Sequence, residues 1–132
     1  MREIIKDGVI LSRLINSNEI TDGLNFFSKD DEFVQVGSWN YSEGKELQKH
    51  IHNVVERKIT RTQEVLYIIS GSIEASIYDL NEVFVDKLVA SRGDVLILLS
   101  SGHGYRILEN ETKVLEIKNG PYLGAEIDRK RF

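Results

Sequence analysis

The chain has 132 residues, of which 41% are hydrophobic and 29% are charged, a composition typical of globular rather than disordered proteins. A net charge of −4 without basic blocks argues against a nucleic-acid partner, and the absence of cysteine excludes disulfides, thiolate metal ligands and cysteine nucleophiles. No apolar run reaches the length of a membrane span and the N-terminus lacks a signal-peptide pattern, so we expect a cytoplasmic protein without a membrane partner.

Short runs rich in Val, Ile, Tyr and Phe alternate with turn residues, which predicts antiparallel strands along most of the chain. Near the start, Asp7-Gly8 separates two apolar runs and indicates a hairpin. One short helix is expected within residues 17–27. The strands expected after it are 33–41, 46–52, 64–70, 72–79, 83–89, 94–99, 104–108 and 113–118.

These elements predict one all-β domain over residues 1–132, because the chain has no internal repeat, linker or low-complexity segment. Antiparallel strands of this number usually protect their edges by closing into a barrel or a double-sheet jelly roll. Apolar residues fall on both sides of the expected strand 64–70, so that strand needs cover on both faces. A second sheet with packed termini or a partner subunit would supply this cover, and we expect a homodimer.

Two of the three histidines, His50 and His52, are separated by one residue inside an expected strand. Side chains alternate along a strand, so both imidazoles should project from one face, about 6.6 Å apart along the backbone. Glu46 and Gln48 share that face. A polar stripe facing a barrel interior needs a purpose, and a metal or ligand site supplies one.

Three segments together resemble the cupin family. Residues 44–52 resemble the opening of the first cupin motif, in which five residues separate a glycine from His-x-His. Residues 64–71 resemble its end, a glutamate followed after six residues by another glycine. Residues 93–103 resemble the second motif, which begins with glycine and ends with histidine. The resemblance covers about residues 33–118 and implies a single jelly-roll β-barrel (a double-stranded β-helix), with the terminal extensions packed on it.

The resemblance also implies a divalent metal held by His50, His52, Glu64 and His103. Glu56 stands at the family's usual distance from His52 and is the alternative carboxylate ligand. Histidine and carboxylate ligands suit Fe, Mn, Ni, Cu or Zn, and the sequence does not choose among these metals.

Basic side chains gather in two places outside these motifs. Arg57, Lys58 and Arg61 precede the expected strand 64–70, where they form either a lid that recognises an anion or a solvated hairpin tip. Residues 129–131 are also basic, and we expect them to be a solvated tail.

One fold serves many reactions, so the fold alone does not fix the function. We expect a metal-dependent enzyme that acts on a small polar or anionic molecule, either an oxygenase or a sugar-type isomerase or epimerase. Small cupins similar to this chain include proteins that act on carbohydrates. Trp39 and Tyr41 offer rings on which a flat ligand could stack, although the aromatic residues of a barrel usually belong to its core. The alternative is a cupin, with or without metal, that binds or senses a small molecule without turning it over.

Overall fold

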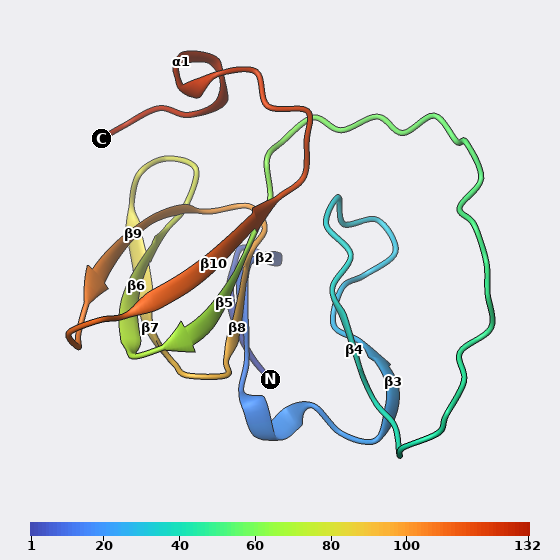
Figure 1. Cartoon of the computed structure of the whole chain (residues 1–132). Coiled ribbons are helices and arrows are strands. Elements are labelled where there is room, and N and C mark those ends of the chain that lie inside the picture. The colour runs from blue at the N-terminus through green and yellow to red at the C-terminus, as the bar shows by residue number, and fades with distance from the viewer.

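The computed structural model describes residues 1–132 as an all-β protein with three antiparallel sheets (Figure 1). The five-stranded sheet has the order β1-β2-β8-β5-β10, the three-stranded sheet β7-β6-β9, and β3 and β4 form a separate pair. The elements in chain order are β1 (Arg2–Lys6), β2 (Val9–Ile15), the 3₁₀ turn η1 (Ser17–Glu19), β3 (Gly23–Phe26), β4 (Gly37–Asn40), β5 (Glu64–Ser70), β6 (Ser72–Tyr78), β7 (Phe84–Ser91), β8 (Val95–Leu98), β9 (Gly102–Ile107), β10 (Lys113–Lys118) and α1 (Ala125–Asp128). The all-β prediction is confirmed, whereas none of the three sheets closes into a barrel.

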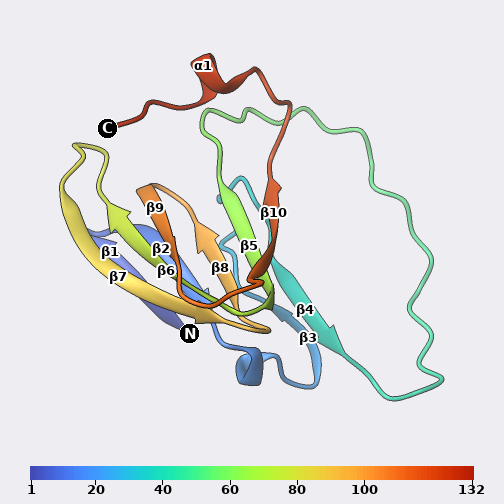
Figure 2. The same cartoon turned by 60° about the vertical axis from the view of Figure 1, so that its left-hand side comes forward.

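The five-stranded and three-stranded sheets pack against each other around the main hydrophobic core (Figures 1 and 2). Alternation along each strand places every second side chain in this interface. The core contains twelve buried residues from both sheets: Ile4, Leu11, Leu14, Leu66, Ile68, Ile73, Ala75, Ile77, Leu88, Ala90, Leu96 and Leu98. The molecule is therefore a sandwich of two unequal sheets, and the pair β3–β4 lies beside it.

A smaller core lies on the opposite face of the five-stranded sheet. Val65 and Ile97, on neighbouring strands, are buried there together with Ile15 and Leu99. Residues 27–36, between β3 and β4, supply the apolar side chains that cover this cluster. The central strands are thus covered on both faces where this cluster lies, whereas Tyr67 and Ile69, farther along β5 on the same outer face, are exposed.

A buried arginine ties the β3–β4 region to the sandwich. Arg13 on β2 is only 1% exposed. Its Nη1 and Nη2 atoms donate to the two oxygens of Glu32 at 2.9 and 3.0 Å, its Nη1 donates to the carbonyl of Phe27 at 2.6 Å, and its Nε donates to Glu3 at 2.8 Å. The hydrogen bond with Glu32 raises the pKa of Arg13, against the effect of burial. The bidentate contact with Glu32 and the hydrogen bond to Phe27 fix residues 27–32 against the sheet.

The predicted strand 46–52 is wrong, because residues 41–63 contain no strand. A strand requires a neighbour for its N–H and C=O groups, and residues 46–60 make no backbone hydrogen bond to the rest of the protein. Exposed aliphatic side chains are frequent here; Ile51 is 90% and Val54 is 104% exposed. In Figure 1 this segment runs from β4 to β5 well away from the sandwich.

The helix expected within residues 17–27 is also mostly wrong. Only η1 forms, with Asn16 and Glu19 in a reciprocal capping arrangement. Gly23, with φ of +81°, then reverses the chain into β3. No helix of the protein is long and apolar enough to span a bilayer.

Candidate functional site

Glu64 and His103 meet where the two large sheets come together. Glu64 is the first residue of β5 in the five-stranded sheet, and His103 lies near the start of β9 in the three-stranded sheet. Oε2 of Glu64 is 3.3 Å from Nε2 of His103. The two sheets therefore each contribute one side of a polar pair at one end of the sandwich.

Glu64 is held in place by its neighbours on β10 and by the entry to β5. Lys118 lies opposite it in the β5–β10 ladder, with Nζ 2.8 Å from Oε1 of Glu64 and 3.0 Å from Glu116. Next to this ladder, the side-chain carbonyl of Asn119 accepts a hydrogen bond from the backbone N–H of Gln63 at 2.6 Å. These contacts fix where the strand begins and where its first carboxylate points.

The charges of the site follow from this geometry. Burial alone would raise the pKa of Glu64, but hydrogen bonds from His103 and Lys118 lower it to about 2. The hydrogen bond to Glu64 raises the pKa of Lys118 in turn. Desolvation, together with the charges of Glu64 and Glu116, raises the pKa of Tyr105 well above its ordinary value. At neutral pH the site therefore contains an ionised carboxylate, an ammonium group and a protonated phenol.

A cavity of about 1110 Å³ adjoins Glu64, His103 and Tyr105. Its far wall is the C-terminal segment, which runs back over the sandwich (Figure 1). The ring of Phe132 meets Tyr78 edge-on with 5.2 Å between the centroids. A Cβ at position 102 would lie 2.9 Å from Cζ of Phe132, so glycine next to His103 gives this ring its space. The cavity is large enough for a small-molecule ligand.

Two polar atoms of this cavity have no partner in the protein. Nδ1 of His103 and the hydroxyl of Ser101 are both buried without a hydrogen bond. Buried polar atoms are nearly always paired, with protein, water or ligand. Both residues line the cavity, although the two atoms themselves are closed to solvent in this arrangement.

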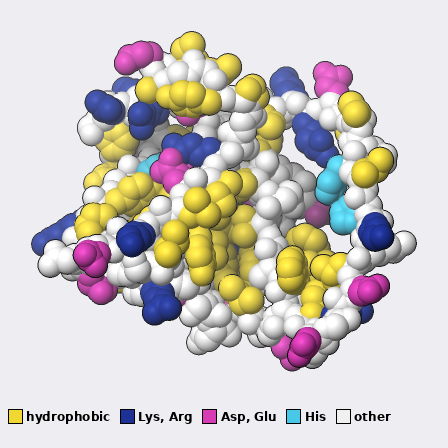
Figure 3. Space-filling view, in the orientation of Figure 1, with side chains coloured by type: hydrophobic (Ala, Val, Ile, Leu, Met, Phe, Trp, Pro, Cys, Tyr) yellow, Lys and Arg dark blue, Asp and Glu magenta, His cyan; other side chains and the backbone are white.

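The other expected metal ligands lie elsewhere. His50 and His52 are exposed on the segment 41–63, with their rings edge-to-face at 5.1 Å, and Nδ1 of His50 is 3.2 Å from the carbonyl of Gln48. Glu56, the alternative carboxylate, is exposed on the same segment. Figure 3 shows histidine side chains in two separate places, on the outlying segment and on the body of the molecule.

The structure thus brings together Glu64 and His103 and leaves His50 and His52 apart from them. No group of three or more His, Cys, Asp or Glu side chains is positioned to hold a metal ion. Oε1 of Glu64 is moreover engaged by Lys118. In this arrangement the four residues do not fit a common metal ion, and the metal-ligand assignment stays a prediction.

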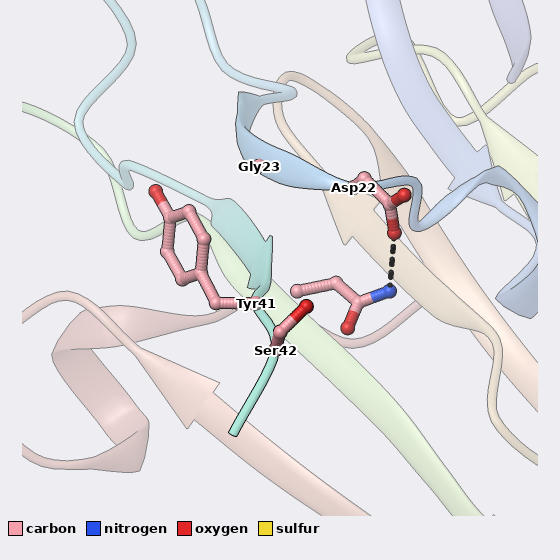
Figure 4. A pocket seen from close by; sticks show the side chains of 5 residues that line it. Asp22, Gly23, Tyr41 and Ser42 are labelled. Carbon is pink, nitrogen blue, oxygen red and sulfur yellow. Dashed lines mark hydrogen bonds between the residues drawn. The ribbon is translucent and has the colours of Figure 1, made fainter. Parts of the chain in front are cut away.

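A second, smaller hollow of about 350 Å³ lies at the end of the β3–β4 pair (Figure 4). The amide of Asn40 donates to Asp22 at 2.9 Å across its floor. Trp39 and Tyr41 stack with 6.3 Å between ring centroids, and both are exposed. The two aromatic residues are therefore surface residues, and neither belongs to a core cluster. Stacking of a flat ligand on them stays a prediction.

The sequence interpretation missed Lys118 and Ser101. Lys118 ends a strand of alternating residues and looks like an ordinary solvent-facing lysine until the β5–β10 pairing is known. Ser101 precedes the histidine of the second motif-like segment, and only its burial distinguishes it from other serines. No local signal in the sequence identifies either residue.

No protein-family model, curated protein or solved structure matches this chain. The resemblance to the cupins depends on the sequence motifs alone.

Proposed function

We propose that the protein binds a small polar molecule in the cavity beside Glu64 and His103. The contact between these two side chains, 3.3 Å across two sheets and next to a cavity of about 1110 Å³, carries the proposal. The unpartnered Nδ1 of His103 and hydroxyl of Ser101 support it, because they offer hydrogen bonds that nothing in the protein takes up.

The chemistry that this arrangement favours is proton transfer. Glu64 engages Nε2 of His103, and Nδ1 has no partner in the protein. Histidine is the side chain that most often acts as a general acid or base in enzymes. The alternative is binding without turnover, which uses the same contacts, and only a ligand that is converted to product would distinguish the two.

A fragment screen followed by ¹⁵N–¹H correlation spectra tests the binding site. We expect polar fragments to shift the amides of residues 101–105 and 64–66. The variant His103→Ala should lose these shifts, and the double variant His50→Ala/His52→Ala, which removes two exposed imidazoles, should keep them. Fragments that bind elsewhere, or that bind His103→Ala as well as the native protein, would overturn the proposal.

A divalent-metal centre in a cupin-type jelly roll is the second proposal. Two motif residues far apart in the sequence, Glu64 and His103, lie in contact, and the sandwich of two sheets is compatible with a jelly roll. A centre with all four ligands requires the segment that carries His50 and His52 to lie over the cavity. Titration with Zn(II), Mn(II) and Fe(II) should then show tight binding that both His103→Ala and His50→Ala/His52→Ala weaken by more than about tenfold. Binding that is absent, or that survives either variant, would eliminate this proposal.

We also propose that the chain forms a homodimer. On the outer face of the five-stranded sheet, four neighbouring apolar side chains of β5 and β10 are exposed: Tyr67, Ile69, Leu115 and Ile117. An exposed patch of this kind usually marks an interface. Light scattering should give a dimer that Ile69→Glu dissociates and that Val89→Glu, on the exposed side of β7, leaves intact. A native monomer would rule the dimer out.

A further inference from the structure

The charged side chains around the cavity differ in whether they have a partner of opposite charge. Five carboxylates line it, and each already has a partner. Glu64 and Glu116 share the ammonium of Lys118, at 2.8 and 3.0 Å. Glu82 forms an ion pair with Lys130.

The two remaining carboxylates have different kinds of partner. Asp79 forms an ion pair with Lys6, and its other oxygen accepts the backbone N–H groups of Asn81 and Val83. Asp128 accepts a hydrogen bond from the hydroxyl of Thr62. Every carboxylate of the cavity thus has a hydrogen-bond or ion-pair partner, although the partner of Asp128 is a neutral hydroxyl.

Three arginines of the same cavity have no carboxylate partner: Arg61, Arg129 and Arg131. They come from two distant parts of the sequence, and the hydrogen bond between Thr62 and Asp128 joins these parts. Thr62 follows Arg61 and Asp128 precedes Arg129, so this bond brings the two arginines to one rim. The cavity lining carries five cationic side chains and five carboxylates, so its formal charges balance, but these three guanidinium groups take part in none of the ion pairs.

Guanidinium groups without a carboxylate suit a ligand with an oxyanion. The planar fork of arginine matches the paired oxygens of a phosphate or carboxylate. Ser101 and His103, which also line the cavity, each have a buried polar atom without a hydrogen-bond partner. The site thus combines a cationic rim with a polar interior.

We infer that the ligand of this cavity is an anionic small molecule, whose phosphate or carboxylate group binds to Arg61 and Arg129 at the rim. This inference rests on the proposed binding site and names the class of molecule that it takes. Arg131 adds positive charge to the same rim. Residues 129–131 are exposed, as a solvated tail would be, and this inference makes them part of a binding surface as well.

Titration of the full chain with inorganic phosphate and with acetate at low ionic strength tests the inference, with amide shifts as the readout. The test variant is Arg61→Gln/Arg129→Gln. The matched control is Arg92→Gln/Arg106→Gln, which removes the same charge from two exposed arginines that do not line the cavity. All four side chains are exposed, so both variants should fold.

We expect saturable anion binding that the test variant weakens by about tenfold or more and that the control leaves within about twofold. Binding of both probes would indicate general oxyanion recognition, and binding of phosphate alone would assign the ligand to phosphate compounds. Absence of saturable binding, or equal weakening in both variants, would overturn the inference. Neutral fragments that still shift the amides around His103 would then show that the proposed binding site stands and that only its anion preference is wrong.

Discussion

Lys118 faces Glu64 directly across the β5–β10 pair, and its ammonium is 2.8 Å from one carboxylate oxygen while His103 lies 3.3 Å from the other. Glu64 thus has one partner, Lys118, in its own sheet and another, His103, in the opposite sheet. Its charge is part of the contact between the two layers of the sandwich, and several properties of the protein should depend on it.

Stability should fall in acid because of this carboxylate. The pKa of Glu64 is lowered from 4.5 to about 2, so its contribution is complete above the unfolded-state value and is lost as the pH falls through the folded-state value. The difference corresponds to about 3 kcal/mol. Urea unfolding of the native protein and of Glu64→Gln, repeated at several pH values between 6 and 2, measures this contribution to the free energy of unfolding. Across this range, the free energy of unfolding of the native protein should fall by about 3 kcal/mol more than that of the variant. An equal fall in both proteins would contradict the lowered pKa of Glu64.

Replacing the buried Arg13 should destabilise the fold strongly. In Arg13→Met, the carboxylate of Glu32 would stay largely buried without its cation, which typically costs about 3–5 kcal/mol. Chemical denaturation at pH 7 gives the free energy of unfolding directly. Arg106→Met, at an exposed arginine of β9, is the control and should change stability by less than about 0.5 kcal/mol. Similar values for the two variants would show that the Arg13 contacts contribute little.

Alanine at position 71 should be tolerated much less well than alanine at position 8. Both glycines have positive φ, of +73° and +78°, so a side chain at either position costs about 1–2 kcal/mol in backbone strain. At Gly71 a Cβ would also lie 2.2 Å from Oγ1 of Thr112, whereas nothing lies within 4 Å at Gly8. Comparing the melting temperatures of Gly71→Ala and Gly8→Ala separates the steric overlap with Thr112, present only at position 71, from the backbone strain that both positions share. Equal shifts would mean that Thr112 moves aside without cost.

Limited trypsin digestion should cut first after Lys49, Arg57 or Lys58. Residues 46–60 are exposed and make no backbone hydrogen bond to the rest of the protein, so the protease can bind them without unfolding the sandwich. Mass spectrometry of the first fragments identifies the site. The comparison is Arg92, whose turn is closed by the hydrogen bond from the N–H of Asp94 to the carbonyl of Ser91. A first cut after Arg92 would show that the segment is protected.

The strands of the sandwich are largely predictable from the sequence, since their apolar alternation is strong and turn residues bound them. The expected strands 64–70 and 113–118 coincide with β5 and β10. The same alternation fails for residues 46–52, because a strand also requires a partner edge and the pattern of one segment does not reveal whether such an edge is free.

The candidate site is only partly visible in the sequence. The motif resemblance selects Glu64 and His103, which the structure places together, and also His50 and His52, which it does not. The arginine rim depends on a hydrogen bond between Thr62 and Asp128, and contacts across such a separation leave no trace in local composition. Burial of Arg13 is equally hidden, since arginine is ordinarily exposed.

Hydrogen bonds anchor the segment 41–63 at both ends. At one end, the side-chain amide of Asn40 donates a hydrogen bond to Asp22. At the other end, the side chain of Asn119 accepts a hydrogen bond from the backbone N–H of Gln63 and donates one to the carbonyl of Arg61. Between these anchors, added residues would cost mainly loop-closure entropy, about 0.6 kcal/mol for each doubling of length. The span is therefore a natural insertion point, where new sequence can be tried while Glu64 and the arginine rim keep their places.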